Sequence, residues 1–370
     1  MKGKIIAAGH ICIDITPVFS SKKQYRKIDE LLEPGKLIHM SPADVHTGGS
    51  VANTGLALKI LGADVQLMGK IGNDAFGSMI QGILNGYGAG GLIVDNNSSS
   101  SYSVVLAVPG IDRIFLHDPG ANDTFTNADI PEADLEDAVL FHFGYPPLMK
   151  KLYESGGSEL VSIFRRMKGK GIATSLDLAA VDPNSEAGKI DWAQILSAVL
   201  PYTDFFVPSF EELCYMLDRE RYDRLLMQGG DMTNALDIEA DVTPLAERCL
   251  QLGCRVVLIK CGTKGMYLRT ADSCVMQTVG QRLDLNAAVW ANQSIFQPCF
   301  VADCVLSGTG AGDTSIAAFL AAVLLGKTPA SCAALAAAEG ACAVTSYDAL
   351  SGLKPLDQLE ARIKSGWKTM

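Results

Sequence analysis

Short apolar runs alternate with stretches of helical periodicity through most of this sequence. Continuous apolar runs are typical of strands buried on both faces, and each helical stretch is long enough to cross back over a sheet. Repeated strand–helix–strand units predict an α/β fold with a mostly parallel sheet covered by helices on both faces. The expected strands are residues 4–8, 65–69, 139–143, 172–176, 205–207 and 256–260. The expected helices are residues 51–61, 75–84, 148–167, 192–200, 211–217, 244–252, 316–325 and 333–344.

Two stretches, residues 11–46 and 98–118, interrupt this alternation and leave no room for a crossover helix. In the second, two apolar runs at residues 102–108 and 113–117 flank a PGID turn, which predicts a hairpin. We expect both stretches to pair as a small antiparallel lid at one edge of the main sheet. The lid and the sheet together predict a single domain over residues 1–370.

Composition and charge exclude several classes of protein. With 370 residues, 48% of them hydrophobic and 19% charged, the chain can bury a large core. A net charge of −10 disfavours nucleic acid and anionic membranes as partners. The ten cysteines have no repeating spacing and the five histidines no zinc-like spacing, so we expect reduced thiols and no zinc centre. The apolar stretches are too short to span a bilayer, and the sequence predicts a soluble, cytoplasmic protein.

Residues 307–313, SGTGAGD, place three glycines and an alanine directly before one carboxylate. A dinucleotide-binding fingerprint does not fit, because Asp313 occupies the position of its third glycine and no βαβ unit follows. A P-loop does not fit either. The GKT at residues 326–328 ends a helical pattern and lacks the glycine that a P-loop requires five positions earlier.

An anion hole at a helix N-terminus explains the glycines better. Without bulky side chains, the N–H groups of Gly310, Ala311 and Gly312 can approach a phosphate, and the helix dipole favours its negative charge. A carboxylate beside a phosphate is repulsive unless it handles a proton. Asp313 is therefore a candidate base for an attacking hydroxyl. The alternative is an ordinary Asp N-cap after a tight turn.

A second group of residues, 47–77, combines a glycine pair and Asn53 with a helix and a strand. Together with the GAN tripeptide at residues 120–122 and Gly312-Asp313, it resembles the PfkB family of ribokinase-like carbohydrate kinases over almost the whole chain. The resemblance implies a three-layer α/β/α fold with a small β lid. It also implies ATP and Mg²⁺ as cofactors, and phosphorylation of a primary hydroxyl of a small sugar or sugar derivative.

The resemblance assigns Asp313 as the catalytic base and Gly310, Ala311 and Gly312 as the anion hole. It matches Asp14, Gly48, Gly49, Asn53 and Asn122 to the substrate, Lys260, Gly262, Gly265 and Thr309 to the nucleotide, and Glu212 to Mg²⁺. Without the family context, Asp14 is equally consistent with an exposed carboxylate at a strand end. Residues 260–265, taken alone, favour a plain hairpin turn over a nucleotide-binding turn.

The sequence departs from the family pattern at two positions. Ser209 stands where the family usually has an Asn three residues before Glu212, which leaves the details of metal binding open. Ser307 stands where potassium-dependent members usually carry an Asp. Because a hard cation prefers anionic oxygen ligands, we predict no potassium dependence, with Thr309 left as one candidate ligand.

Substrate specificity is expected in the lid. The lid residues expected to face the substrate are His39, Tyr102, His117, Asp118 and Asn122. A nucleoside kinase on the same fold is one alternative, although the lid offers few aromatic side chains to hold a base. A non-catalytic sugar-binding regulator is another. By analogy with the family, the lids are expected to pair in a homodimer.

Overall fold

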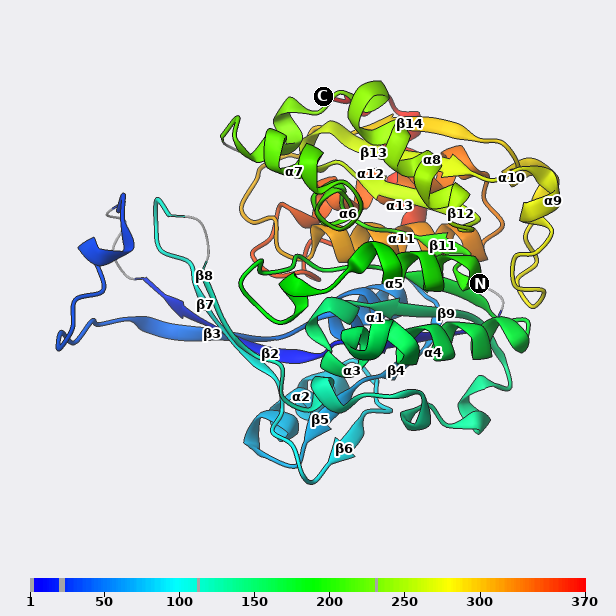
Figure 1. Cartoon of the computed structure of the whole chain (residues 1–370). Helices are drawn as coiled ribbons and strands as arrows, with labels where there is room; N and C mark the ends of the chain where they lie inside the picture. The colour runs from blue at the N-terminus through cyan, green and yellow to red at the C-terminus, as the bar shows by residue number, and fades with distance from the viewer. Residues whose placement is uncertain (1–2, 20–23, 112–113, 230–231) are drawn as a thin grey trace.

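The computed structural model describes residues 3–19, 24–111, 114–229 and 232–370. Its largest sheet has eight strands in the spatial order β14-β13-β12-β11-β10-β9-β1-β4 (Figure 1). These strands are β1 (Lys4–Gly9), β4 (Asp64–Met68), β9 (Ala138–Gly144), β10 (Ala173–Leu176), β11 (Phe205–Phe206), β12 (Val256–Lys260), β13 (Gly265–Thr270) and β14 (Ser294–Pro298). A separate two-stranded sheet pairs β5 (Lys70–Gly72) with β6 (Ile93–Asp95) in parallel.

The strands β4, β1, β9, β10, β11 and β12 are parallel to one another, and they are the six strands expected from the apolar runs. The predicted mostly parallel sheet is therefore confirmed. The apolar runs do not predict β13 and β14, which extend the sheet as antiparallel strands. β14 is only partly buried, so its sequence has no continuous apolar run.

The helices are α1 (Ser50–Ile60), α2 (Ala75–Gly86), α3 (Lys150–Tyr153), α4 (Ser158–Gly169), α5 (Trp192–Val199), α6 (Phe210–Leu217), α7 (Arg219–Leu226), α8 (Thr243–Gln251), α9 (Ser273–Met276), α10 (Ala287–Trp290), α11 (Ala311–Leu324), α12 (Pro329–Ala343) and α13 (Leu356–Lys364). The single helix predicted over residues 148–167 is wrong. Ser155, Gly156 and Gly157 between α3 and α4 have positive φ angles of 51°, 66° and 74°, which a right-handed helix cannot contain. The sequence pattern also misses α7 and α13, because each buries too few apolar side chains to show a stripe.

Side chains of each central strand alternate between two cores. On β12, Val256 and Leu258 pack in a cluster with residues of α11 and α12. Val257 and Ile259 pack in another cluster with residues of α4, α5 and α6. Because successive strand residues point to opposite faces, the sheet is the middle layer of three, as expected.

Four strands form the lid: β2 (Cys12–Val18), β3 (Ser41–Gly48), β7 (Tyr102–Leu106) and β8 (Ile114–Asp118). They pair in the order β3-β2-β7-β8 and project from one side of the molecule (Figure 1). The predicted hairpin is confirmed as β7 and β8. The lid is not wholly antiparallel as predicted, because β2 and β7 pair in parallel. Arg113 and Asp112, which the hairpin prediction included, lie outside the described residues.

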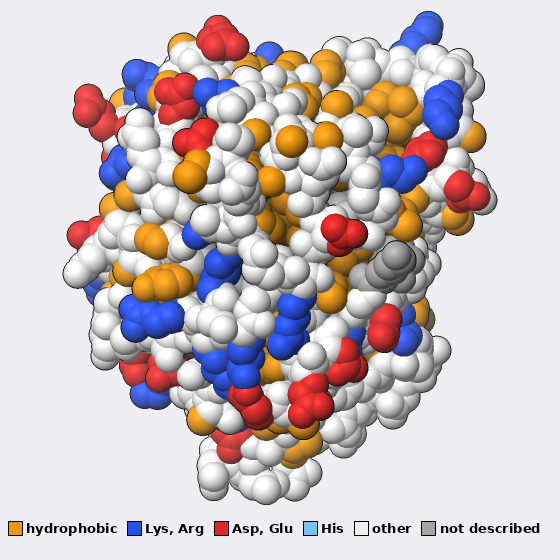
Figure 2. All heavy atoms as spheres, turned by 90° about the vertical axis from the view of Figure 1, so that its right-hand side faces the viewer, with side chains coloured by type: hydrophobic (Ala, Val, Ile, Leu, Met, Phe, Trp, Pro, Cys, Tyr) orange, Lys and Arg blue, Asp and Glu red, His pale blue; other side chains and the backbone are white. Residues whose placement is uncertain are grey.

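The surface carries charged side chains of both signs. On the face turned away from the lid, Lys and Arg side chains are interspersed with Asp and Glu (Figure 2).

All ten cysteines lie in described segments, and every one is a free thiol, as expected. In the part of the chain that the structure describes, no helix has both the length and the apolar character needed to cross a membrane.

Candidate active site

The glycine-rich segment forms the start of α11. Gly310, with φ of 73°, is the N-cap, and Ala311 is the first helical residue. Asp313 is the third residue of the helix, so the alternative that it is an N-cap is wrong. The first-turn N–H groups of a helix have no intrahelical acceptor. The N–H of Ala311 makes a long 3.4 Å bond to Gly308 O, and the residues of the predicted anion hole lie at a half-buried helix N-terminus.

Gly310→Ala is expected to destabilise the protein by about 1–3 kcal/mol and to remove most activity. An alanine Cβ here would overlap the side chain of Ala349, and the left-handed φ disfavours any other residue. Gly308→Ala is the matched control in the same loop, since a Cβ there meets nothing within 4 Å and its φ is not positive. Urea unfolding and turnover of both variants test this. Equal losses in the two variants would contradict it.

Asp313 is nearly fully buried at 4% exposure, and side chains surround its carboxylate. Asn53 Nδ2 donates to Oδ2 at 3.1 Å and Thr54 Oγ1 donates to Oδ1 at 3.0 Å. The hydroxyl of Tyr145 lies 2.8 Å from both oxygens. Burial raises the pKa of Asp313, while Lys260 and these three donors oppose the rise. A carboxyl with a raised pKa is a better proton acceptor than an ordinary surface Asp.

Lys260 lies at the end of β12, and its ammonium faces the start of α11. Its Nζ donates to Asp177 Oδ1 at 2.9 Å, and both side chains are largely buried. A Cβ built on Gly312 would lie 3.6 Å from Nζ. The ammonium and the N-terminus of α11 therefore face the same space, and both favour an anion there.

Most of the residues predicted to bind the substrate lie together between the lid and α1, on the acceptor side of the site. Asp14 on β2 is half-buried rather than exposed, and a Cβ on Gly48 would overlap its carboxylate. Gly49, with φ of 84°, is the N-cap of α1, the helix that carries Asn53 to Asp313. The buried ring of His10 lies beside Gly49, and burial, followed by the charge of His117, lowers its pKa to about 3. A neutral imidazole thus accompanies the Asp14 carboxylate on this side of the site.

Asn122 hydrogen-bonds the backbone on both sides of its amide. Its Oδ1 accepts from Ile11 N at 3.1 Å, and its Nδ2 donates to Ile11 O at 2.9 Å and to Pro119 O at 3.0 Å. Both amide hydrogens are therefore engaged by backbone oxygens. In the structure Asn122 holds the segment between β1 and β2 in place, and its contact with substrate stays a prediction.

The predicted metal-binding residue, Glu212, forms a capping box at the start of α6. Its Oε2 accepts from Ser209 N at 2.8 Å, and its own N–H donates to Ser209 Oγ at 3.3 Å. Ser209, which departs from the family pattern, is thus the N-cap of this helix. Among the described residues, no group of three or more His, Cys, Asp or Glu is placed to hold a metal ion.

The remaining nucleotide-side residues lie in two turns. Gly262 has a φ of 54°, and a Cβ there would collide with the side chain of Thr233. Gly265 has a φ of 121°, and a Cβ there would collide with Gln297 O. Packing alone therefore requires both glycines. Ser307 Oγ accepts from the backbone N–H of Thr309 at 3.1 Å, and the two hydroxyls lie 2.9 Å apart. Nucleotide binding by these residues stays a prediction.

The sequence pattern misses three residues that contact or face Asp313 and Lys260: Thr54, Tyr145 and Asp177. Tyr145 and Asp177 directly follow β9 and β10, two neighbouring parallel strands. Carboxyl ends of parallel strands meet at one edge of a sheet, where ligands of open α/β folds bind. That rule, applied to the polar residues that follow the predicted strands, is the signal that identifies them.

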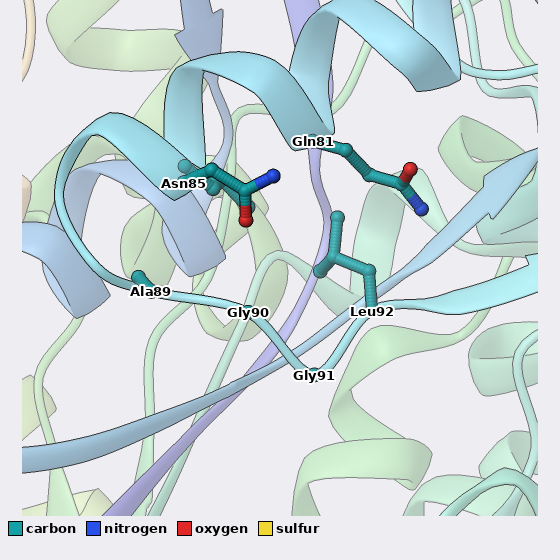
Figure 3. A pocket seen from close by; sticks show the side chains of 7 residues that line it. Gln81, Asn85, Ala89, Gly90, Gly91 and Leu92 are labelled. Atoms are coloured by element: carbon teal, nitrogen blue, oxygen red, sulfur yellow. The ribbon is translucent and has the colours of Figure 1, made fainter.

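A separate hollow of about 220 Å³ lies between α2 and the segment of residues 89–92. Figure 3 shows Gln81 and Asn85 on the helix and Leu92 on the facing segment. None of its lining residues contacts Asp313 or Lys260. It therefore takes no part in the site described above.

The three-layer fold and its lid match those of known kinases. The ribokinase of Arabidopsis thaliana, solved with ribose and ATP, superimposes with a TM-score of 0.72 at 21% identity over 98% of this chain and 99% of that one. A fructokinase of Xylella fastidiosa with bound ATP superimposes with a TM-score of 0.71 at 19% identity over 99% of both chains. The fold is ribokinase-like. The family model of the pfkB family carbohydrate kinases matches residues 11–355, and the chain belongs to this family.

Sequence relatives are distant. The chain is 27% identical to fructokinase-2 of rice over 232 residues, which is 61% of each protein. It is 24% identical to the ribokinase of Arabidopsis thaliana over 325 residues, 86% of this chain and 73% of the relative. The aligned part thus covers less than two thirds of the rice enzyme.

Proposed function

We propose that this protein is an ATP-dependent kinase that phosphorylates a primary hydroxyl of a small sugar or sugar derivative. One observation carries the proposal. A buried carboxylate, Asp313, lies in the first turn of a helix whose N-terminus faces a buried ammonium, that of Lys260. A base next to a preformed anion site is the minimum that phosphoryl transfer from ATP to an alcohol requires.

In the proposed reaction, Asp313 takes the proton of the acceptor's hydroxyl. The acceptor oxygen forms a bond to the γ-phosphorus while the bond from that phosphorus to the β,γ-bridging oxygen breaks, and ADP leaves with the electron pair. The N–H groups at the start of α11, those of Gly310, Ala311 and Gly312, together with Lys260, stabilise the charge on the transferred group. The proton on Asp313 then passes to solvent.

The site also fits Mg²⁺ that arrives with ATP. Mg²⁺ in kinases is usually held by one or two carboxylates, several waters and the nucleotide phosphates, so a dedicated protein cage is not required. Glu212 and Asp177 are the carboxylates next to Lys260, because the charge of Glu212 acts on both Asp177 and Lys260. When bound, the ion neutralises charge on the phosphates.

A sugar fits the acceptor side better than a nucleoside. Asp14, Gly49 and Asn53 supply polar groups suited to hydroxyls, and His10 adds a neutral ring beside them. A nucleoside would also need an aromatic slot for its base. Tyr102 in the lid already packs on Phe76, with ring centroids 5.4 Å apart.

The experiment is a coupled assay of ATP consumption with the purified full chain against a panel of pentoses, hexoses, sugar acids and nucleosides. Phosphorylation of a sugar supports the proposal, and preferential phosphorylation of a nucleoside would replace it with the nucleoside kinase. Binding of sugars without turnover across the whole panel would favour a non-catalytic regulator.

We also propose that the lids of two copies pair in a homodimer. The lid exposes large apolar side chains, with Leu37 at 84% and Leu116 at 54% exposure. Leu116→Asp is expected to shift the protein toward monomer, because a charge would then be buried in the interface. Light scattering after size exclusion measures this. Leu226→Asp on α7, where Leu226 is 56% exposed, is the control and should leave the mass unchanged. A monomeric wild type would contradict the proposal.

A further inference from the structure

Three donors surround the carboxylate of Asp313 in this structure. A carboxylate accepts about four hydrogen bonds, two on each oxygen. Thr54 bonds to Oδ1, Asn53 bonds to Oδ2, and the hydroxyl of Tyr145 lies within 2.8 Å of both oxygens. An acceptor hydroxyl must donate to one of these oxygens before it can lose its proton. The phenol oxygen lies equally close to both carboxylate oxygens, so an acceptor hydroxyl that approaches between them has to displace Tyr145.

Two of the three donors are held rigidly. Asn53 and Thr54 are on α1, which packs against α11, and Thr54 is fully buried. The Thr54 and Asn53 bonds thus join two packed helices. Both donors are therefore fixed by the packing of α1 on α11 more firmly than a residue in a loop is.

Tyr145 is held differently. It follows the last residue of β9 and precedes Pro146 and Pro147, in a short connection outside helix and strand. Its φ of 67° is left-handed, a conformation that costs a residue with a side chain about 1 kcal/mol or more. Such strain is concentrated at functional positions. Relief of this strain favours a rearrangement of Tyr145 over one of α1.

Tyr145 also lies toward the acceptor side. Its ring centroid is 6.3 Å from that of His10, and His10 lies against Gly49 and 5.2 Å, ring to ring, from His117 of the lid. The phenol thus enters between Asp313 and the residues proposed to hold the sugar. It approaches the carboxylate from the direction in which the acceptor hydroxyl must arrive.

We propose that Tyr145 is a removable cap on the base: its hydroxyl occupies, in the free protein, the place on Asp313 that the acceptor's hydroxyl takes in the reacting complex. This inference rests on the proposed function, because it requires Asp313 to be the base. The cap keeps water off the carboxylate until an acceptor is bound. The protein then avoids transferring phosphate from ATP to water. Tyr145 is in this sense a positioning residue and takes no proton itself.

The charges around Tyr145 keep its phenol protonated, so its hydroxyl can donate a hydrogen bond to Asp313. Burial and the carboxylates of Asp313, Asp177 and Glu212 raise its pKa well above the ordinary value, so the phenol keeps its proton. The groups that face Asp313 are Lys260 from β12, Asn53 and Thr54 from α1, and Tyr145, and all of them lower its pKa against the effect of burial. Loss of the Tyr145 bond thus raises the pKa of Asp313. The acid limb of the pH–rate profile should then move to higher pH.

The test compares Tyr145→Phe with Thr54→Val in the full-length protein. Both variants keep the shape of the side chain and remove one hydrogen bond to Asp313. In Tyr145→Phe we expect ATP hydrolysis without acceptor to rise above the wild-type background, since water can then reach the base. The KM of the acceptor should fall about two- to tenfold, because a neutral hydrogen bond no longer competes with it. In Thr54→Val the acid limb should move in the same direction, but acceptor-free hydrolysis should rise less than in Tyr145→Phe, because Thr54 donates from within the contact of α1 with α11 and does not cover the acceptor side.

The outcomes separate this inference from the proposed function. Unchanged acceptor-free hydrolysis, acceptor KM and pH profile in Tyr145→Phe, with circular dichroism showing a folded protein, would overturn the cap. An equal rise of hydrolysis in Thr54→Val would also overturn it, because the effect would then come from any weakening around Asp313. If Tyr145→Phe unfolds, Tyr145→His, which keeps a ring with a polar edge beside Asp313, is the second variant, and its acceptor-free ATP hydrolysis gives the same readout. Failure of the proposed function shows instead as unaltered turnover in an Asp313 variant.

Discussion

Asp313→Asn is expected to lower kcat by about 10²–10⁴-fold, because an amide cannot take the proton of the acceptor's hydroxyl. Asn has the same shape and still bonds Thr54 and Tyr145 through its remaining oxygen. The fold should therefore be retained. The KM of ATP should change little, since the helix N-terminus and Lys260 are untouched. Steady-state kinetics at saturating ATP and acceptor measure the effect.

A matched control exists on another helix. Asp357 also lies in the first turn of its helix, α13, but it is exposed. Asp357→Asn should leave kcat within error of the wild type. Near-normal turnover in Asp313→Asn, with an unchanged thermal unfolding midpoint, would remove Asp313 as the base and with it the proposed mechanism.

The central sheet could be predicted because its signal is local. Residues such as Val256 to Ile259 are buried on both faces, so they form a continuous apolar run that is visible without the fold. The N-terminal position of Asp313 in a helix is equally local, since the glycines and the apolar spacing after them stand side by side in the sequence. Local patterns therefore predict the sheet and the position of Asp313 in the first turn of a helix.

The other residues of the site come from segments that are far apart in the sequence and are brought together only by the fold. Asp313 contacts Asn53 from 260 residues away and Tyr145 from 168 residues away. The only sequence signal for Tyr145 is its place directly after a predicted strand, and this position does not reveal that its hydroxyl contacts Asp313. The parallel pairing of β2 with β7 is likewise a property of chain topology, which the hairpin signal of residues 102–118 does not contain. The sequence pattern therefore predicts local structure but not the long-range contacts that assemble the site.

For Lys260, at the end of β12, the family pattern predicts a ligand but not the neighbouring side chains. The resemblance matches Lys260 to the nucleotide, and the structure adds its partner. The Lys260 ammonium is surrounded by the carboxylates of Asp177, Glu212 and Asp313, which all favour its charged form against the effect of burial. Lys260 therefore has two roles in the proposed site: it neutralises these carboxylates and attracts the phosphates of ATP.

Lys260→Met is expected to lower the free energy of unfolding by about 3–5 kcal/mol at alkaline pH, because Asp177, whose pKa burial raises to about 8, is ionised there and then lacks its partner. Turnover should fall by about 10²–10³-fold through loss of one group that stabilises the transferred phosphoryl. Urea unfolding and steady-state kinetics measure the two effects. Lys150→Met is the control, since its pair with Glu186 is exposed, and it should change neither quantity.

The two roles of Lys260 separate in a double variant. Lys260→Met combined with Asp177→Asn should regain most of the stability, because no unpaired buried charge remains, but not the turnover. Burial raises the pKa of Asp177 and Lys260 lowers it, so in Lys260→Met the folded-state pKa of Asp177 rises further above its unfolded value. The folded protein then binds the extra proton as pH falls, and the stability deficit of the single variant should shrink toward acidic pH. A deficit that is independent of pH, or a double variant as unstable as the single one, would show that Asp177 is not the group Lys260 neutralises.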